Sequence, residues 1–119
     1  MKKSIINDKS YKFALRVVKL YKYLIDVNKE YVISKQILRS GTSIGANVEE
    51  AYYAQSKKDF ISKMSIALKE AAETKYWLRL LKDSNSIKNN KKVDNLILEC
   101  EEIIKILTSI LNTAKKKST

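Results

Sequence analysis

A series of mostly apolar residues between Phe60 and Leu81 is spaced alternately by four and three through three heptads. The positions in this series are Phe60, Met64, Ala67, Ala71, Thr74, Leu78 and Leu81. An α-helix places such residues on one face, whereas a strand would alternate them by two. The chain also has no proline and only two glycines among 119 residues, which leaves few places for the tight turns of a β-fold. We therefore expect an all-α protein.

Three other stretches have the same helical periodicity, so the chain contains four amphipathic segments. The predicted helices cover about residues 8–27, 34–54, 57–82 and 91–114. Asp8 or Ser10 is expected to cap the first helix, and Ser56 with Asp59 resembles a capping box at the start of the third. Residues 1–119 are thus predicted to form a single domain, an antiparallel up-and-down four-helix bundle.

Both glycines lie in the segment Arg39–Ala51, which reads RSGTSIGANVEEA. A phosphate-binding loop needs a preceding strand, four residues between its glycines and a following Lys-Ser/Thr pair. Here three residues separate Gly41 from Gly45, and the helical periodicity continues through both. A glycine inside a helix costs about 0.8–1 kcal/mol relative to alanine, which closer helix packing can offset. We predict that the two glycines allow another helix to approach closely.

Ser43, Asn47 and Glu50 follow at i, i+4 and i+7, on one side of the same predicted helix. Polar groups that are partly buried there need hydrogen-bond partners. The expected partners are on the third helix: Lys69, Glu70 and Glu73. This polar set is predicted to fix the register of two helices rather than to perform chemistry.

The chain has a formal net charge of +11, from 24 basic and 13 acidic residues. Such an excess attracts polyanions, and lysines contact phosphates as point charges that read little sequence. The candidate phosphate-binding residues are Lys9, Lys12, Arg16 and Lys19 on the first helix, Lys75, Arg79 and Lys82 on the third, and Lys115, Lys116 and Lys117 in the tail. Tyr23 lies on the stripe of the first helix. The alternative is that these side chains form ordinary solvated helix faces.

The chain contains no histidine and one cysteine, Cys100, inside an apolar run. Zinc sites of the usual Cys/His kind and Ser-His-Asp or Cys-His catalysis cannot form without histidine, so we expect no enzyme activity, metal or cofactor. Cys100 is expected to be a buried, reduced thiol. The N-terminus has no apolar signal-peptide region and no apolar run approaches 18 residues, so a cytoplasmic protein without membrane contact is expected.

The fourth helix carries more apolar residues than one stripe requires. Those predicted to lie off its stripe are Leu98, Ile103, Ile106 and Ile110. Leu15 lies off the stripe of the first helix. The pattern favours a second interface with another subunit, and the alternative is one wide buried face.

The segment Leu38–Leu81 contains a distinctive pattern, which consists of Ser43, Ile44, Asn47, Val48 and Glu50, then Ser56, Asp59 and Phe60, then Ala67, Leu68, Glu70 and Glu73. In this pattern the segment resembles the family of the 23S rRNA intervening-sequence proteins, which is related to the accessory variability proteins of diversity-generating retroelements. Ala51 stands where many relatives have glycine, a difference that leaves the fold untouched.

This resemblance implies a four-helix bundle that assembles into a ring-shaped homo-oligomer, commonly a pentamer. It also implies basic surfaces that bind RNA or DNA, and no catalytic activity or small-molecule substrate. Two functions stay open at this point. The chain either binds nucleic acid itself or serves as an oligomeric scaffold for a protein partner such as a reverse transcriptase.

Overall fold

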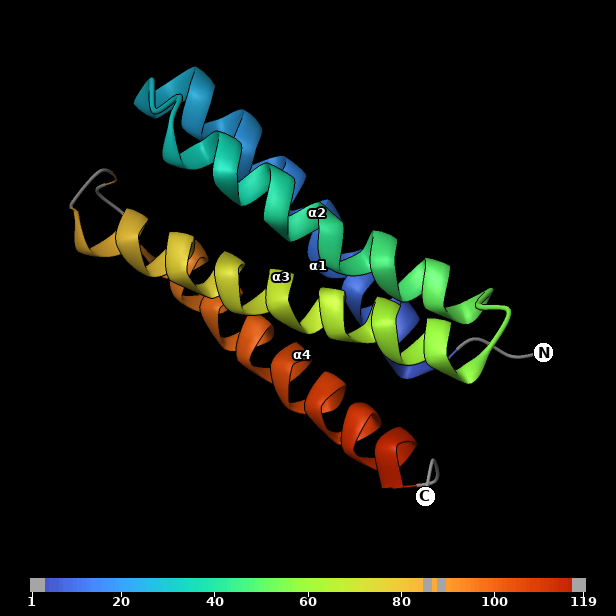
Figure 1. Ribbon diagram of the computed structural model, residues 1–119. Helices are drawn as coiled ribbons and strands as arrows, with labels where there is room; N and C mark the ends of the chain where they lie inside the picture. Colours follow the sequence, from blue (N-terminus) through green and yellow to red (C-terminus); the bar gives the residue numbers. More distant parts are fainter. Residues whose placement is uncertain (1–3, 85–86, 88–89, 117–119) are drawn as a thin grey trace.

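The computed structural model describes residues 4–84, 87 and 90–116, and the regular structure in that part of the chain is helical throughout. Its elements are α1 (Ile5–Tyr23), a π-helical segment η1 (Leu24–Asn28), α2 (Ile33–Tyr52), α3 (Lys57–Asp83) and α4 (Lys91–Lys116). Successive α-helices run in opposite directions and form an elongated bundle measuring 49 × 21 × 21 Å (Figure 1). The predicted all-α, four-helix architecture is confirmed. No helix in the described residues is long and apolar enough to cross a membrane.

The start of α1 differs from the prediction. Ser4 is the N-cap, and its backbone N–H donates to Oδ1 of Asn7 at 3.3 Å. Asp8 lies in the first turn, and the Ser10 hydroxyl is buried and donates to the Ile6 carbonyl at 2.7 Å. The prediction that Asp8 or Ser10 caps the helix was therefore wrong, because the helix begins one turn earlier. The predicted cap of α3 is confirmed, since the Asp59 N–H donates to Ser56 Oγ at 3.0 Å.

The corner between α1 and α2 has two features that periodicity does not reveal. The α-helical part of α1 ends at Tyr23, and η1 follows with a left-handed residue, Lys29 (φ 54°), at its C-terminus. Glu30 then accepts hydrogen bonds from the first backbone N–H groups of α2, at 2.7 Å from Ser34 and 3.1 Å from Ile33. These donors have no partner within the helix, so the carboxylate of Glu30 stabilises the start of α2.

The hydrophobic core runs along the whole bundle. It includes Ile103, one of the residues predicted to form a second interface with another subunit. Ile103 is fully buried, together with Cys100 and Leu107, whereas Ile97 and Ile104 are only half-buried. The buried face of α4 is thus rotated relative to the predicted stripe, and the assignment of Ile103 to a second interface was wrong. The predicted stripe consisted of Val93, Ile97, Cys100, Ile104, Leu107, Leu111 and Ala114. A rotation of this kind is possible because α4 has apolar residues on both sides of its stripe.

Gly41 and Gly45 face α1. A Cβ atom added at Gly41 would lie 2.9 Å from both methyl carbons of Val17, and one added at Gly45 would lie 3.3 Å from the Ser10 carbonyl oxygen. Neither glycine has a positive φ, so the backbone itself does not require glycine at these positions. What requires it is the close approach of α1 to α2.

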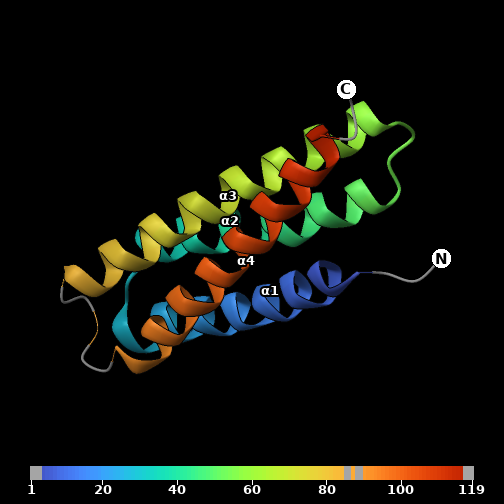
Figure 2. The same ribbon diagram turned by 90° about the horizontal axis from the view of Figure 1, so that it is seen from below.

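The relation of α1 to α4 is different. α4 begins beside the C-terminal end of α1 and diverges from it, so the two helices are well separated at the other end of the bundle (Figures 1 and 2). Both helices still bury apolar side chains along their length, including Phe13 of α1 and Leu107 of α4.

Candidate nucleic-acid interface

Carboxylates of α4 neutralise four of the predicted phosphate-binding residues. Toward α1, Glu102 lies 2.5 Å from the Nζ atom of Lys9, and Glu99 pairs with Arg16. The corresponding pairs toward α3 are Lys75–Glu101 at 3.0 Å and Lys82–Asp94 at 2.7 Å. Acidic residues on both edges of α4 thus connect it to its two neighbours, and these four cations have a structural role.

Two of these pairs perturb the ionisation of their members. A hydrogen bond and the charge of Lys9 lower the pKa of Glu102, and a hydrogen bond and the charge of Asp94 raise the pKa of Lys82. Both groups are solvent-exposed, so each pair adds little to stability. They align the helices without holding the bundle together.

The other candidates have different surroundings. Lys12 pairs with Asp8 on its own helix at 3.0 Å. Arg79 is exposed on α3, while Lys115 and Lys116 are exposed in the last turn of α4. Lys117 lies outside the described residues. The predicted stripes therefore do not form one continuous cationic surface in the described part of the chain.

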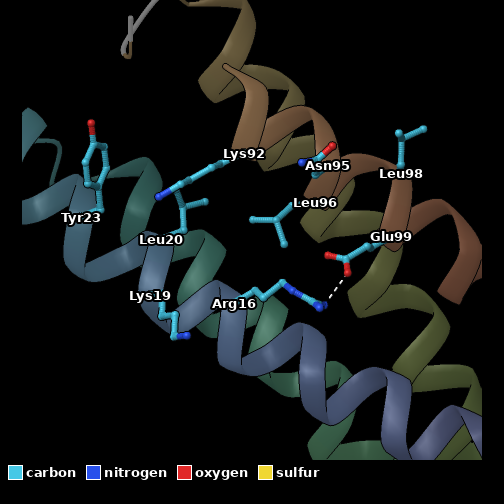
Figure 3. Close-up of a pocket in the computed structure, with 9 residues that line it drawn as sticks. All are labelled: Arg16, Lys19, Leu20, Tyr23, Lys92, Asn95, Leu96, Leu98 and Glu99. Atoms are coloured by element: carbon cyan, nitrogen blue, oxygen red, sulfur yellow. Dashed lines mark hydrogen bonds and ion pairs between the residues drawn. The ribbon is translucent and has the colours of Figure 1, made fainter. Parts of the chain in front are cut away.

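A groove between α1 and α4 has two cations without an ion pair in the described part of the chain, Lys19 and Lys92, among its lining residues. It has a volume of about 610 Å³ and is lined by Arg16, Lys19, Leu20 and Tyr23 from α1 and by Lys92, Asn95, Leu96, Leu98 and Glu99 from α4. Figure 3 shows Leu96 pointing from α4 into the space between the helices and Lys92 reaching across toward α1. Leu20 and Leu96 are buried, so they form an apolar floor between charged walls.

Lys19 and Lys92 form no ion pair with any described residue. The Nζ atom of Lys92 instead lies 5.7 Å from the centre of the Tyr23 ring, in a cation–π contact. Lys92 is also at the start of α4, where the helix dipole disfavours a cation. This position therefore does not stabilise the helix, and it leaves the ammonium group available to an anion.

Sequence reasoning missed Lys92, Asn95 and the apolar floor of this groove. The available signal was the pair Lys91-Lys92 at the first turn of a helix, which is electrostatically unfavourable. Of the predicted residues, Arg16 and Lys19 line the groove, and Tyr23 lies beside them. The structure thus assembles part of the predicted stripe of α1 with a part of α4 that was not predicted.

A second groove, of about 680 Å³, lies between α1 and α2. Its described lining includes Asp8, Tyr11 and Glu49 and contains no basic residue. An anion would meet negative charge in this groove, so it does not suit a polyanion.

The predicted polar set connects α2 to α3 through Glu50, but not through the partners that were expected. Asn47 donates to the Ser43 carbonyl of its own helix at 2.8 Å, and Glu50 pairs with Lys63 at 3.1 Å. The expected partners were Lys69, Glu70 and Glu73, so this part of the prediction was wrong. Glu50 does reach α3, but its partner there is Lys63, in the second turn of that helix, and the Asn47 amide bonds within α2.

Other residues connect these two helices. Arg39 of α2 pairs with Glu70 at 3.2 Å and also with Glu73, whose carboxylate accepts the indole N–H of Trp77 at 2.9 Å. Beneath them, the buried hydroxyls of Ser40 and Thr74 lie 2.9 Å apart and are hydrogen-bonded. These contacts fix the register of α2 against α3, a role that the prediction had assigned to other residues of α2.

Comparisons with known proteins give two matches. The profile of a family described as 23S rRNA-intervening sequence protein matches residues 2–109. A crystal structure of a protein of unknown function from the S23 ribosomal protein family of Bacteroides thetaiotaomicron is 53% identical, with a TM-score of 0.86 over 90% of this chain and 98% of that one. None of the curated proteins compared matches the chain.

Proposed function

The chain belongs to the 23S rRNA-intervening sequence protein family, and on that premise we propose that it is a cytoplasmic, non-enzymatic protein that binds RNA or DNA as a homo-oligomer. The observation that carries this proposal is the pair of unpaired ammonium groups, Lys19 and Lys92, on opposite walls of the α1–α4 groove. Two such groups can hold successive phosphates of one strand.

The balance of charge supports a polyanion as the ligand. The chain has a net charge of +11, and Glu99, the one carboxylate among the described lining residues of the groove, is already paired with Arg16. Lysine ammonium groups are strongly hydrated point charges that attract phosphate without reading base edges. The proposed binding is therefore independent of sequence and sensitive to salt.

The affinity of the protein for a fluorescently labelled oligonucleotide, measured by anisotropy over a range of salt concentrations, tests this function. Replacing Lys19 and Lys92 with alanine removes two phosphate contacts. The slope of log affinity against log salt for a single strand should then fall by about 1.4. The matched control replaces Lys57 and Lys58, exposed at the start of α3, and removes the same charge. Absence of binding by the wild type at low salt, or an equal loss in the control, would refute the proposal.

Self-association is supported by apolar residues on the outer face of α3. Ile66, Tyr76 and Leu80 are exposed there and lie on one side of the helix. A second subunit covering them would leave the α1–α4 groove open, and a ring of subunits would multiply the net charge presented to nucleic acid. Light scattering should give a mass several times the 13.7 kDa of one chain, and the expected oligomer is a pentamer. A 13.7 kDa species would contradict self-association.

The same apolar face of α3 supports the alternative function, a scaffold for a protein such as a reverse transcriptase. The two functions differ in their response to salt. Phosphate binding weakens steeply as salt is added, whereas a scaffold whose charge only maintains solubility binds no oligonucleotide at low salt.

A further inference from the structure

We propose that the α1–α4 groove takes an unpaired nucleotide, with its base stacked on the ring of Tyr23 and its phosphates on Lys19 and Lys92. This inference rests on the proposed function and specifies its ligand as single-stranded nucleic acid. It follows from the composition of the groove rather than from its charge alone.

The floor of the groove is the first argument. Leu20 and Leu96 form an apolar surface between the charged walls. A duplex presents phosphates and sugars at its surface and keeps the faces of its bases stacked inside. A duplex therefore offers no apolar surface that could pack against this floor. An unpaired base has two exposed apolar faces, and proteins that bind single strands combine cationic grooves with aromatic platforms for this reason.

Tyr23 provides the platform. Its side chain is 45% exposed, and its ring lies at the end of the groove next to Lys92. The adjacent Leu24 is fully buried and begins η1, so the backbone carrying Tyr23 is anchored in the core. A ring held in this way can accept a base with little loss of conformational entropy.

Lys92 connects the two parts of the site. In the free protein its ammonium group lies 5.7 Å from the centre of the Tyr23 ring, where a stacked base would also lie. When a base stacks on the ring, the flexible side chain of Lys92 turns to a flanking phosphate and exchanges a cation–π contact for an ion pair. Asn95, on the same wall, adds an amide group that can donate to and accept from the edge of a base.

The experiment compares a labelled single strand of about 12 nucleotides with a hairpin duplex of the same composition. The wild type should bind the single strand more tightly. Tyr23→Ala should weaken binding of the single strand about tenfold and leave binding of the duplex unchanged. Tyr23→Phe keeps the ring and should retain the affinity. The matched control is Tyr11→Ala, another exposed tyrosine of α1 that lines the acidic groove, and it should have no effect.

Stacking has a direct spectroscopic signature. A 2-aminopurine base within the single strand should lose fluorescence on binding to the wild type and to Tyr23→Phe, but not on binding to Tyr23→Ala. Circular dichroism of each variant checks that the helices are intact. If the fluorescence decrease is absent with a folded Tyr23→Ala variant, the result supports the stacked base.

Three negative results are possible, and they differ in what they refute. If the wild type binds both oligonucleotides equally and Tyr23→Ala changes neither affinity, the stacked base is refuted and the proposed function stands. If the wild type binds neither at low salt, the function is refuted and this inference with it. An equal loss for both oligonucleotides in Tyr23→Ala would also refute stacking.

Discussion

The two sides of α1 are built from different kinds of residue. Toward α2, the glycines Gly41 and Gly45 let the backbone of α2 approach α1 closely, at Val17 and Ser10. Toward α4, Leu20 and Leu96 form an apolar floor, and the charged ends of long side chains pair above it in Lys9–Glu102 and Arg16–Glu99.

This difference separates stability from binding. A closely packed interior becomes less stable when atoms are added to it or removed from it, so the contact of Gly41 with Val17 leaves no room for a ligand. Exposed ion pairs contribute little to stability and exchange readily with other ions. We infer that the α2 side of α1 maintains the fold and that the α4 side is available for binding.

The strongest test of the packed side is Gly41→Leu. The new side chain would meet both methyl groups of Val17, so we expect a loss of about 3 kcal/mol in the free energy of unfolding. Urea denaturation followed by far-UV circular dichroism measures it. Ala46→Leu, at an exposed position of the same helix, is the matched control and should cost little. An unchanged urea midpoint for Gly41→Leu would refute the close contact.

A smaller effect is expected at the corner that joins α1 to α2. Glu30→Ala removes the carboxylate that accepts from Ser34 and Ile33, and this should cost about 1–2 kcal/mol. Glu30→Gln keeps an acceptor oxygen and should lose less. The urea midpoints of the two variants provide the comparison, and equal values would show that the carboxylate does not cap α2.

The packed face of α4 gives a pH-dependent effect. Burial raises the pKa of the Cys100 thiol from 9.0 to about 12. The unfolded chain therefore loses this proton first, and stability falls as pH rises from 9 toward 12. At pH 10 the thiol should account for about 1 kcal/mol of that loss. Cys100→Ala removes this part, so the stability of the wild type relative to the variant should decline over this range; a constant difference would contradict the burial.

The smallest effect is expected for Glu102→Gln, on the α4 side of α1. Because Lys9 lowers the pKa of Glu102, the pair stabilises the fold above the ordinary pKa of a glutamate, and this contribution is lost as pH falls through the lowered value. Urea midpoints at pH 7 should differ little between the variant and the wild type, and they should converge at low pH. A large loss at pH 7 would mean that the α1–α4 side also maintains the fold.

The course of the helices could be predicted from the sequence, and the contacts between them could not. Periodicity identifies an apolar stripe such as that of α3, because burial acts on every turn. Periodicity does not determine how far α4 is rotated about its own axis. That rotation places Ile103 in the core and turns Glu99 and Glu102 toward α1.

Partner assignment failed for the same reason. The sequence places the cations of α1 on one stripe, but which of them are neutralised depends on the helix that lies beside them. The polar contacts between α2 and α3 are made by Arg39, Ser40 and Glu50, whereas the Asn47 amide bonds within α2. Lys19 and Lys92 line the same groove although they are far apart in the sequence. Periodicity within one helix gives no information about such a pair.

The division of α1 into a packed side and a binding side is tested most directly by NMR chemical-shift mapping with a single-stranded oligonucleotide. We predict that the amide shifts will concentrate in residues 16–23 of α1 and 92–99 of α4, with little change at Ser10, Gly41 and Gly45. Shifts centred on the α1–α2 contact, or on the lysines at the start of α3 and the end of α4, would contradict the account.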